Sequence, residues 1–543
     1  GTAPCKTACP AHIAVQGYLK LAAQGKYREA LQLIKRENPF PAVCGRICNR
    51  RCEDACTRGT IDQAVAIDEV KRFIAQQDLD AATRFVPEKV IPKVDGEFSE
   101  KIAIIGGGPA GLSCAYYLAE KGYRPTVFEK EARTGGMLMN GIPSFRLEKD
   151  VVEAEIDVLR ALGVELRTGV EVGRDVTIAQ LREEGYRGFY LAVGLQSGGK
   201  LGVPGDDARG VEAGIDFMRA VNLRGEKTLS GRVVVIGGGN IAADVARTAV
   251  RCGAESVTMY CLEGYDEMPM GEEDRSECER DGVVIRAGWG QTEITSADGV
   301  CTGIRLRKCL RVKNDEGRFA PVFDDEQTEE TACTTVLYCI GQKADWRTLL
   351  TGTAVELRPN GTAVTDPVTG QTAEPDIFAG GDAVTGQKFA IDAIAAGKEG
   401  AISLHRYVQG AHLTIGRNRR QFIELDKKNA LIPIDSYDTT PRQRIGYNEA
   451  LRRTFRDERV AFTEEQVRAE TARCLGCGAS VVDPNKCIGC GVCTTKCAFD
   501  AIHLHRERPE CSTMVASEDK MKAILPYMVK REIKIKRAAR KKK

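Results

Sequence analysis

The sequence predicts an α/β protein in which a parallel-sheet region carries one glycine-rich fingerprint twice and a cysteine cluster lies toward each end. Three observations predict it. From Lys101 to about Tyr407, short β-branched runs alternate with helical stretches, which is typical of a parallel sheet covered by helices. A glycine-rich strand-to-helix turn occurs at Gly106 and again at Gly237. Six of the 21 cysteines fall in the first 60 residues and seven in the last 70.

Length, charge and hydropathy narrow the class of protein. At about 150 residues per domain, 543 residues suggest three or four domains, and 43% hydrophobic residues are enough for large cores. Lys and Arg total 78 and Asp and Glu 76, so nothing indicates nucleic-acid binding. No uncharged apolar run approaches the roughly 18 residues that span a bilayer, and no signal peptide is recognisable. We therefore expect a cytoplasmic protein without a membrane span. The first residue is Gly1 rather than Met, so we expect a trimmed or incomplete N-terminus.

The cysteine clusters indicate metal rather than disulfides. Disulfide frameworks are typical of small secreted domains, and this chain is large. Because the sequence holds only five His, thiolates are the expected ligands, and all-thiolate sites select zinc or iron–sulfur clusters. Around the first cluster, residues 11–80 carry apolar positions at helical spacing and are predicted to be helical. Residues 81–99, with two prolines and no periodicity, are predicted to form a linker.

The first fingerprint spans residues 101–130. A β-branched run leads into Gly106-x-Gly108-x-x-Gly111 and a helical stretch, and a second strand ends at Glu129. The three glycines permit a tight turn, the approach of a pyrophosphate and close helix packing, while the carboxylate can bind a ribose hydroxyl. The free N–H groups of the helix N-terminus favour the phosphates. This segment therefore predicts a dinucleotide site.

The second fingerprint spans residues 231–263 and reads Gly237-x-Gly239-x-x-Ala242 between two predicted strands. Two fingerprints imply two dinucleotides, usually a flavin paired with a nicotinamide, since hydride must pass between them. A further strand is predicted to end at Asp382, before a helix, which suits the ribityl and phosphate end of FAD; the alternative is an ordinary turn aspartate. The stretches 190–194 and 336–342 are interpreted as crossings between two nucleotide domains, or as plain core strands.

The second cysteine cluster has the spacing of a bacterial ferredoxin. It reads Cys487-x2-Cys490-x2-Cys493-x3-Cys497, with Ala498 in place of the usual Pro. We expect at least one 4Fe–4S cluster here, with zinc as the alternative. Additional cysteines that could complete a second cluster are Cys474, Cys477 and Cys511.

Together these motifs resemble the family of the small (beta) subunit of NADPH-dependent glutamate synthase over about residues 1–410. The motifs are CxxxCPAHI at 5–13, CGRICNRRCEDAC at 44–56, GGGPAGL at 106–112, GGMLMNGIPSFRL at 135–147, IGGGNIAADVAR at 236–247, EMP at 267–269 and FAGGDA at 378–383. The resemblance implies a helical iron–sulfur domain followed by two Rossmann-like domains, with the NAD(P) domain inserted into the FAD domain. We expect the nucleotides to contact Gly106, Gly108, Pro109, Ala110, Gly111, Glu129, Gly136, Gly237, Gly239, Asn240, Ala242, Glu263, Gly381 and Asp382.

The resemblance also implies cluster ligands near the N-terminus. The matching cysteines are Cys5, Cys9, Cys48, Cys52 and Cys56, while Cys44 has no secure counterpart. The family carries two 4Fe–4S clusters in this domain. Relatives place a CxxC just upstream of the position of Cys5; because this sequence starts at Gly1, that pair is either missing from the sequence or absent from the protein. One cluster is therefore the safer expectation in this segment, with structural zinc as the alternative, and two to four clusters in the whole chain.

The choice of nicotinamide nucleotide departs from the NADPH-dependent members of the family. Those members often carry two arginines after the second strand of the nicotinamide domain, whereas this chain has Tyr260-Cys261-Leu262-Glu263. A carboxylate repels a 2′-phosphate and can bind a free 2′-hydroxyl, which favours NAD(H) over NADP(H). Arg247 or Arg251 is the candidate that would restore NADP binding.

The sequence thus predicts a flavin and iron–sulfur oxidoreductase subunit that moves electrons between NAD(P)H, FAD and 4Fe–4S clusters. The electrons pass to or from the other redox subunits of a larger complex, of the ferredoxin-linked transhydrogenase or hydrogenase type, or a soluble ferredoxin. The alternatives are a glutamate synthase small subunit and a non-catalytic electron-relay scaffold. No protein acid or base is expected to be catalytic. The basic end, with nine Lys or Arg in its last 15 residues, is expected to be solvated or to dock on an acidic partner. The expected parts are the helical iron–sulfur domain (1–85), the FAD domain (100–205 and 346–410), the NAD(P) domain (206–345), a wrapping linker (411–470), the ferredoxin-like module (471–512) and the basic tail (513–543).

Overall fold

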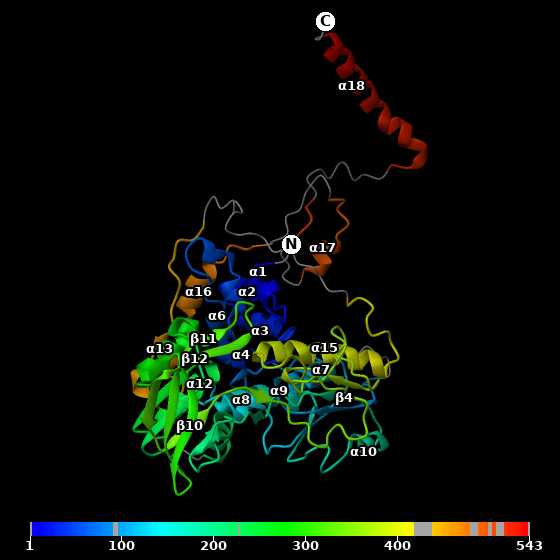
Figure 1. Cartoon of the computed structure of the whole chain (residues 1–543). Helices are drawn as coiled ribbons and strands as arrows, with labels where there is room; N and C mark the ends of the chain where they lie inside the picture. The colour runs from blue at the N-terminus through cyan, green and yellow to red at the C-terminus, as the bar shows by residue number, and fades with distance from the viewer. Residues whose placement is uncertain are drawn as a thin grey trace. The chain divides into compact units, whose positions relative to one another are not determined.

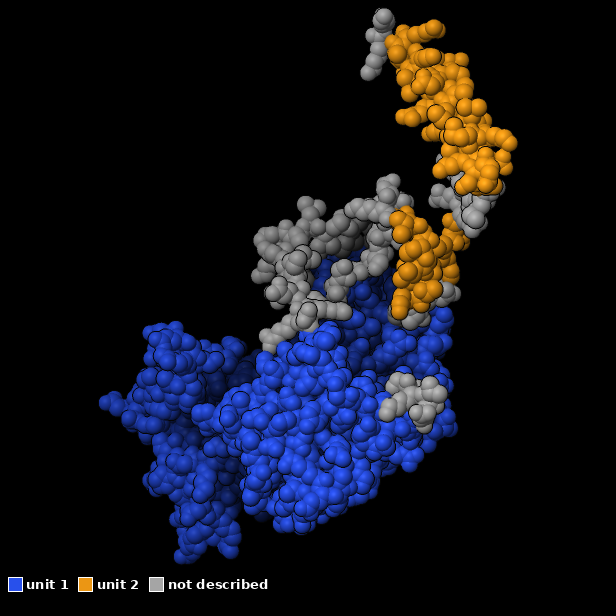
Figure 2. Space-filling model, turned by 90° about the vertical axis from the view of Figure 1, so that its right-hand side faces the viewer, with its two compact units in different colours: residues 1–479 blue, residues 480–543 orange. Residues whose placement is uncertain are grey.

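The computed structural model describes residues 3–90, 96–225, 228–417, 437–477, 487–497, 502–505 and 515–540. The chain divides into two compact units, residues 1–479 and residues 480–543, each of which is described by itself (Figure 2). No helix within the described ranges is long and apolar enough to cross a membrane.

The N-terminal part of the first unit is helical, as the spacing of its apolar residues predicts. Its helices are α1 (Pro4–Ala8), α2 (Val15–Ala23), α3 (Tyr27–Lys35), α4 (Pro41–Ile47), α5 (Arg51–Asp54) and α6 (Ile67–Ala75). Leu31, Ile34, Val70 and Ile74 are fully buried in the core that these helices share. The N-terminus of α4 is held from outside the domain, because the buried carboxylate of Glu155 accepts the first N–H groups of that helix at 2.7 and 2.9 Å.

The first parallel sheet has the strand order β15-β4-β1-β2-β3. Its strand β4 is labelled in Figure 1. Its strands are β1 (Lys101–Ile105), β2 (Thr126–Glu129), β3 (Glu165–Thr168), β4 (Tyr186–Leu191) and β15 (Ile377–Ala379). The helices of this domain are α7 (Pro109–Glu120), α8 (Met137–Asn140), α9 (Lys149–Ala161), α10 (Ile178–Glu183), α14 (Asp382–Thr385) and α15 (Ala390–Val408). Helices α7 and α15 pack closely, since a Cβ on Gly397 would lie 2.2 Å from the carbonyl oxygen of Ala110. Because β15 pairs with β4, the chain returns to this sheet after the long segment between these two strands.

The segment between β4 and β15 contains a second parallel sheet of order β6-β13-β7-β8-β9, which confirms the inserted domain. Its strands are β6 (Val211–Ala213), β7 (Arg232–Ile236), β8 (Ser256–Cys261), β9 (Val284–Ala287) and β13 (Thr335–Tyr338), with helices α11 (Gly214–Arg219), α12 (Asn240–Arg251) and α13 (Glu272–Asp281). The chain enters and leaves the insert through a short antiparallel ribbon of β5 (Ser197–Gly198) and β14 (Gln342–Lys343). An antiparallel sheet that the sequence did not indicate adds β10 (Trp289–Ala297), β11 (Val300–Lys313) and β12 (Phe319–Ala332).

Residues 437–477 return to the helical N-terminal domain. They form β16 (Gly446–Tyr447), β17 (Arg459–Val460) and α16 (Glu464–Ala472). Phe462 and Val467 are buried in the same apolar core as α2 and α6. This part of the expected linker is therefore packed on the protein rather than merely connecting two domains.

The second unit contains α17 (Val492–Lys496) and α18 (Lys520–Arg540). Helix α18 carries most of the basic tail, contains Pro526 and buries none of its residues. The expectation of a solvated end agrees with this exposure, although residues 520–540 are helical rather than irregular. Ala498 and Cys511 lie outside the described residues.

Candidate functional site

The first glycine fingerprint forms a cradle with no room for side chains on two sides. A Cβ on Gly106 would lie 2.3 Å from the carbonyl oxygen of Ala192, and a Cβ on Gly111 would lie 2.0 Å from that of Gly106. The first glycine therefore permits the turn and the third permits close helix packing, as the motif predicts. A Cβ on Gly108 would have only one protein atom within 4 Å, the Cα of Gly136 at 3.8 Å. The second glycine is thus open on the side where a pyrophosphate would approach.

Glu129 closes this cradle from the end of β2. Its side chain is buried and accepts the N–H groups of Gly107 and Glu131 at 2.8 and 2.9 Å. Burial raises the pKa of this carboxyl, and the two backbone donors oppose the rise. The second fingerprint has the same arrangement, because a Cβ on Gly238 would lie 3.0 Å from a carboxylate oxygen of Glu263.

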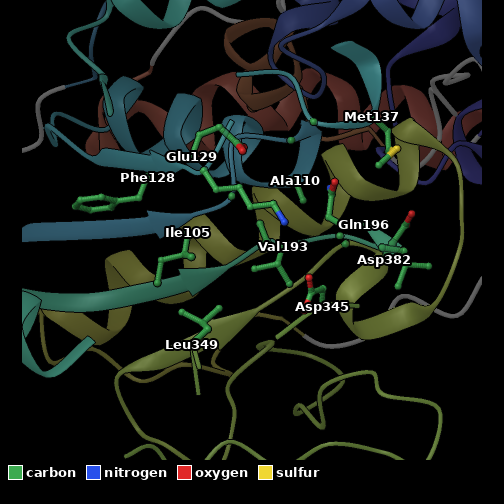
Figure 3. A pocket seen from close by; sticks show the side chains of 18 of the residues that line it. Ile105, Ala110, Phe128, Glu129, Met137, Val193, Gln196, Asp345, Leu349 and Asp382 are labelled. Atoms are coloured by element: carbon green, nitrogen blue, oxygen red, sulfur yellow. The ribbon is translucent and has the colours of Figure 1, made fainter. Parts of the chain in front are cut away.

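The cradle opens into a pocket that is lined by residues before the inserted domain in the chain and by residues after it (Figure 3). Ala110 and Glu129 reach it from the first fingerprint, and Asp382 reaches it from the start of α14. The Asp382 carboxylate accepts the N–H of Lys388 at 3.2 Å, and burial raises its pKa to about 6. Other residues that line the pocket include Gly106, Gly108, Pro109, Gly136, Gln196, Asp345 and Gly381. A glycine-lined cradle beside a helix N-terminus, with a carboxylate at each end, fits the pyrophosphate and sugars of FAD.

A second cavity joins the two fingerprints. Pro109, Met137 and Asp382 line it from the FAD domain, and Gly239 and Asn240 line it from the start of α12. Two other expected residues of the second fingerprint do not line this cavity. Gly237 lies in the turn with a φ of 142°, and Ala242 is buried.

An ion pair spans the two domains beside this cavity. Arg146 lies 2.8 Å from the carboxylates of both Asp244 on α12 and Asp274 on α13. Ile47, the last residue of α4 in the helical domain, also lines the cavity. Three parts of the chain therefore meet at this point.

Arg247 and Arg251 are not placed to bind a nucleotide phosphate. Both guanidinium groups are buried on Asp281, at 2.7 and 2.6 Å, and both lie over the ring of Phe145. They stabilise the packing of α12 against α13. The sequence suggestion that one of them restores NADP binding is therefore not supported.

The N-terminal cysteines fall into two groups. Cys5 and Cys56 line a small cavity of their own. Burial, together with the neighbouring Cys56, Cys474 and Cys477, raises the pKa of the Cys5 thiol to about 12. Cys474 and Cys477 line the same cavity, so the structure places them with the helical domain and not with the ferredoxin-like module expected from their position in the chain.

The other group lies where α4 ends and α5 begins. Cys48 follows α4, and Cys52 lies within α5. Cys9 is near enough to Cys48 for its charge to raise the pKa of the Cys48 thiol. Cys44 is fully buried one turn before Cys48. Nowhere in the described ranges do three or more His, Cys, Asp or Glu side chains surround a single point as they would around one metal ion. A 4Fe–4S cluster makes no such demand, since each thiolate binds a different iron.

In the second unit, Cys487, Cys490 and Cys493 are exposed and Cys497 is half-buried, with Cys493 carried on α17. None of the twenty described cysteines forms a disulfide.

A buried charge pair that the sequence did not reveal lies beside the Cys48 group. Lys71 and Asp68, both on α6, are 2.5 Å apart and almost completely buried. Burial raises the pKa of Cys48 and Cys52, and Lys71 opposes that rise for both thiols. In the sequence the two residues resemble the solvated face of an amphipathic helix, so no local pattern could have identified them.

We predict that Lys71→Met shifts the midpoint potential of the cluster held by this group to a more negative value, by tens of millivolts. A cation beside a cluster stabilises the added electron, and a potential depends on such nearby charge. The measurement is an anaerobic redox titration followed by EPR. The matched control is the double variant Lys71→Met with Asp68→Asn, which leaves the net local charge unchanged. Its midpoint potential is expected to return most of the way to that of the unaltered protein. An unchanged potential in the single variant would show that Lys71 is too far from the cluster.

Comparison with known proteins agrees with this architecture. The sequence model described as pyridine nucleotide-disulphide oxidoreductase matches residues 100–397. The chain belongs to this family. A model for a 4Fe–4S cluster, described as dihydropyrimidine dehydrogenase domain II, matches residues 1–83, and a 4Fe–4S binding domain matches residues 480–503. The chain is an NAD(P)H-dependent oxidoreductase whose cofactors are FAD and 4Fe–4S clusters.

Two relatives and one solved structure illustrate the family. The beta subunit of NADP(+)-dependent formate dehydrogenase from Moorella thermoacetica is 35% identical over 88% of this chain and 70% of its own length. The small chain of NADPH glutamate synthase from Halomonas elongata is 34% identical over 75% of this chain and 88% of its own, which confirms the resemblance seen in the motifs. FprA from Mycobacterium tuberculosis, in complex with NADPH, shares the fold, with a TM-score of 0.50 and 18% identity over 61% of this chain and 88% of its own.

Proposed function

We propose that this chain transfers electrons between a nicotinamide nucleotide and its 4Fe–4S clusters through FAD, and exchanges them with other redox subunits or with a soluble ferredoxin in the cytoplasm. The twenty cysteines within the described ranges form no disulfide, which supports a reducing compartment. The relatives that are named as subunits support a place in a larger assembly.

The cavity shared by the two fingerprints carries this proposal. Gly239 and Asn240 lie on one side of it, Pro109 and Asp382 on the other, and Ile47 borders it from the iron–sulfur domain. FAD held beside this cavity would supply the conversion between a two-electron hydride and the single electrons that iron–sulfur clusters require. The residue after Ile47 is Cys48, so a candidate cluster ligand directly follows a residue of the cavity wall.

The residues of the chain bind and orient the two nucleotides rather than moving protons. Gly106, Gly108 and Gly111 leave room for FAD, and Glu129 and Asp382 offer carboxylates to its sugars. Residues in matching roles for the nicotinamide nucleotide are Gly237, Gly239, Asn240, Ala242 and Glu263. The Arg146 ion pairs fix the angle between the two domains.

Anaerobic titration with NADH and NADPH tests the proposal. The expected result is loss of the flavin absorbance followed by EPR signals of reduced clusters. A flavin that neither nucleotide reduces would leave only a relay scaffold. Identification of the chains that co-purify separates a glutamate synthase assembly from other redox complexes.

We further propose a preference for NAD(H). Glu263 faces the turn of the second fingerprint as Glu129 faces that of the first. Arg247 and Arg251, the two arginines of α12, are engaged in buried ion pairs. A carboxylate in this position accepts hydrogen bonds from a ribose and repels a 2′-phosphate.

We expect Glu263→Gln to lower kcat/KM for NADH by about tenfold, which corresponds to the loss of one hydrogen bond to a charged group, and to raise kcat/KM for NADPH. The measurement is dye reduction with each nucleotide. Glu267→Gln, which alters an exposed carboxylate nearby, is the matched control and should leave the ratio unchanged. A ratio that stays constant in Glu263→Gln would show that the specificity lies elsewhere.

A further inference from the structure

We propose that Cys5, Cys56, Cys474 and Cys477 together bind one 4Fe–4S cluster. Two of the ligands come from the N-terminal helical domain and two from a segment more than 400 residues later in the chain. The matched iron–sulfur models cover residues 1–83 and 480–503, so neither of them includes Cys474 or Cys477. The assignment depends on the iron–sulfur content of the chain but not on its reaction with nucleotides.

The four cysteines line one small cavity. Pro4 and Cys5 reach it from α1, and Gln16 and Leu19 reach it from α2. Its walls include the fully buried side chains of Val65 and Ile67, which shield it from water. The side-chain N–H of Gln16 donates to the carbonyl oxygen of Cys477 and fixes the end of the later segment. Four thiols in a partly apolar enclosure form a donor set that selects zinc or an iron–sulfur cluster. The 4Fe–4S model that matches the domain containing Cys5 and Cys56 favours the cluster.

Buried ion pairs hold Cys474 in this place. Arg473, the preceding residue, is almost fully buried and lies 2.7 Å from Glu470 and 3.0 Å from Asp62. Glu470 also accepts the N–H of Ala66 at 2.7 Å. Removing charges from water is costly unless they are paired, so this network defines one position for the end of α16 on the helical domain.

The loops that carry Cys56 and Cys474 are also joined directly. Arg58, two residues after Cys56, donates to the carbonyl oxygen of Arg473 at 3.0 Å, and its side chain is fully buried. Arg473 in turn donates to the carbonyl oxygen of Gln63 at 2.6 Å. The two halves of the ligand set therefore belong to one rigid part of the fold.

This assignment gives Cys5 and Cys56 two further thiolates. The pair Cys474-x2-Cys477 lies beside Cys5 in the same cavity. The ferredoxin-like module does not require this pair, since it has four cysteines of its own.

EPR and metal analysis of the full chain, purified anaerobically and reduced with dithionite, test the assignment. We expect Cys5→Ala and the pair Cys474→Ala with Cys477→Ala to lose the same EPR signal, together with about four iron and four sulfide per chain. Combining all three changes should remove no more iron than either alone. Cys490→Ala should remove a different signal. Cys309→Ala, which alters a buried cysteine in β11, is the matched control and should keep all signals.

Three results would overturn the proposal. The first is that the Cys474 and Cys477 pair loses the signal lost in Cys490→Ala and keeps the one lost in Cys5→Ala. The second is one zinc per chain that disappears with Cys5. The third applies where the alanine variants do not fold, as judged by loss of FAD, and it comes from serine variants instead. In that case Cys474→Ser and Cys56→Ser, which retain an oxygen ligand, must change the same signal, and changes in two different signals would refute the shared site. Because no nucleotide is used, failure here is distinct from failure of the proposed electron transfer.

Discussion

Gly108→Ala is expected to give a folded protein that no longer retains FAD. Gly108 has φ −82° and ψ −178°, which alanine adopts without strain, and the added Cβ would lie 3.8 Å from the nearest protein atom. The fold should therefore tolerate the change. The methyl group would instead occupy the space that the pyrophosphate needs, and the flavin content and every nucleotide-dependent activity should fall by more than an order of magnitude.

Gly239→Ala is the matched control, because it makes the same change in the second fingerprint. Gly239 has φ −98° and ψ 177°, and an added Cβ would have no protein atom within 4 Å. This variant should retain FAD and lose its reduction by NADH or NADPH. The measurements are flavin content after gel filtration and the rate at which the flavin is reduced. If Gly108→Ala retained its flavin while Gly239→Ala lost it, the assignment of the two fingerprints would have to be reversed.

The fingerprints and the sheets could be predicted because their determinants are local. A strand, a glycine turn, a helix and a terminal carboxylate lie within about 30 residues, and steric contacts such as that between Gly111 and Gly106 depend only on that segment. The insertion of one domain into the other was also predictable, since the second fingerprint lies between Gly106 and Asp382, the two expected FAD positions, and the family resemblance supplied the order.

The grouping of the cysteines could not be predicted in the same way. Cys474 and Cys477 are close in sequence to the ferredoxin-like cysteines, and their contact with Cys5 depends on the packing of residues 437–477. The residues that direct this packing, Arg473 and Glu470, resemble an exposed pair on a surface helix until their burial is known. The same limitation applies to Arg247, whose ion pair with Asp281 on another helix decides that it cannot bind a phosphate.

Cys48→Ala is expected to separate flavin reduction from cluster reduction. Ile47 borders the cavity between the two nucleotide domains, and Cys48 is the next residue, with its Cα about 3.8 Å away. We infer that a cluster held by Cys9, Cys48 and Cys52 would be the one that receives electrons from the flavin. Without it, NADH or NADPH should still reduce the flavin at the normal rate, whereas reduction of the other clusters should slow by more than an order of magnitude.

Rapid freeze-quench EPR after mixing with NADH measures both steps. Cys490→Ala is the control, since it removes a cluster of the second unit and should leave the remaining clusters reduced at the rate of the unaltered protein. If Cys48→Ala reduced its remaining clusters equally fast, electrons would leave the flavin by another path. The position of Ile47 would then reflect packing alone. Because the variant retains the fingerprints and the Arg146 ion pairs, a slow step that appears only after flavin reduction can be assigned to the missing cluster.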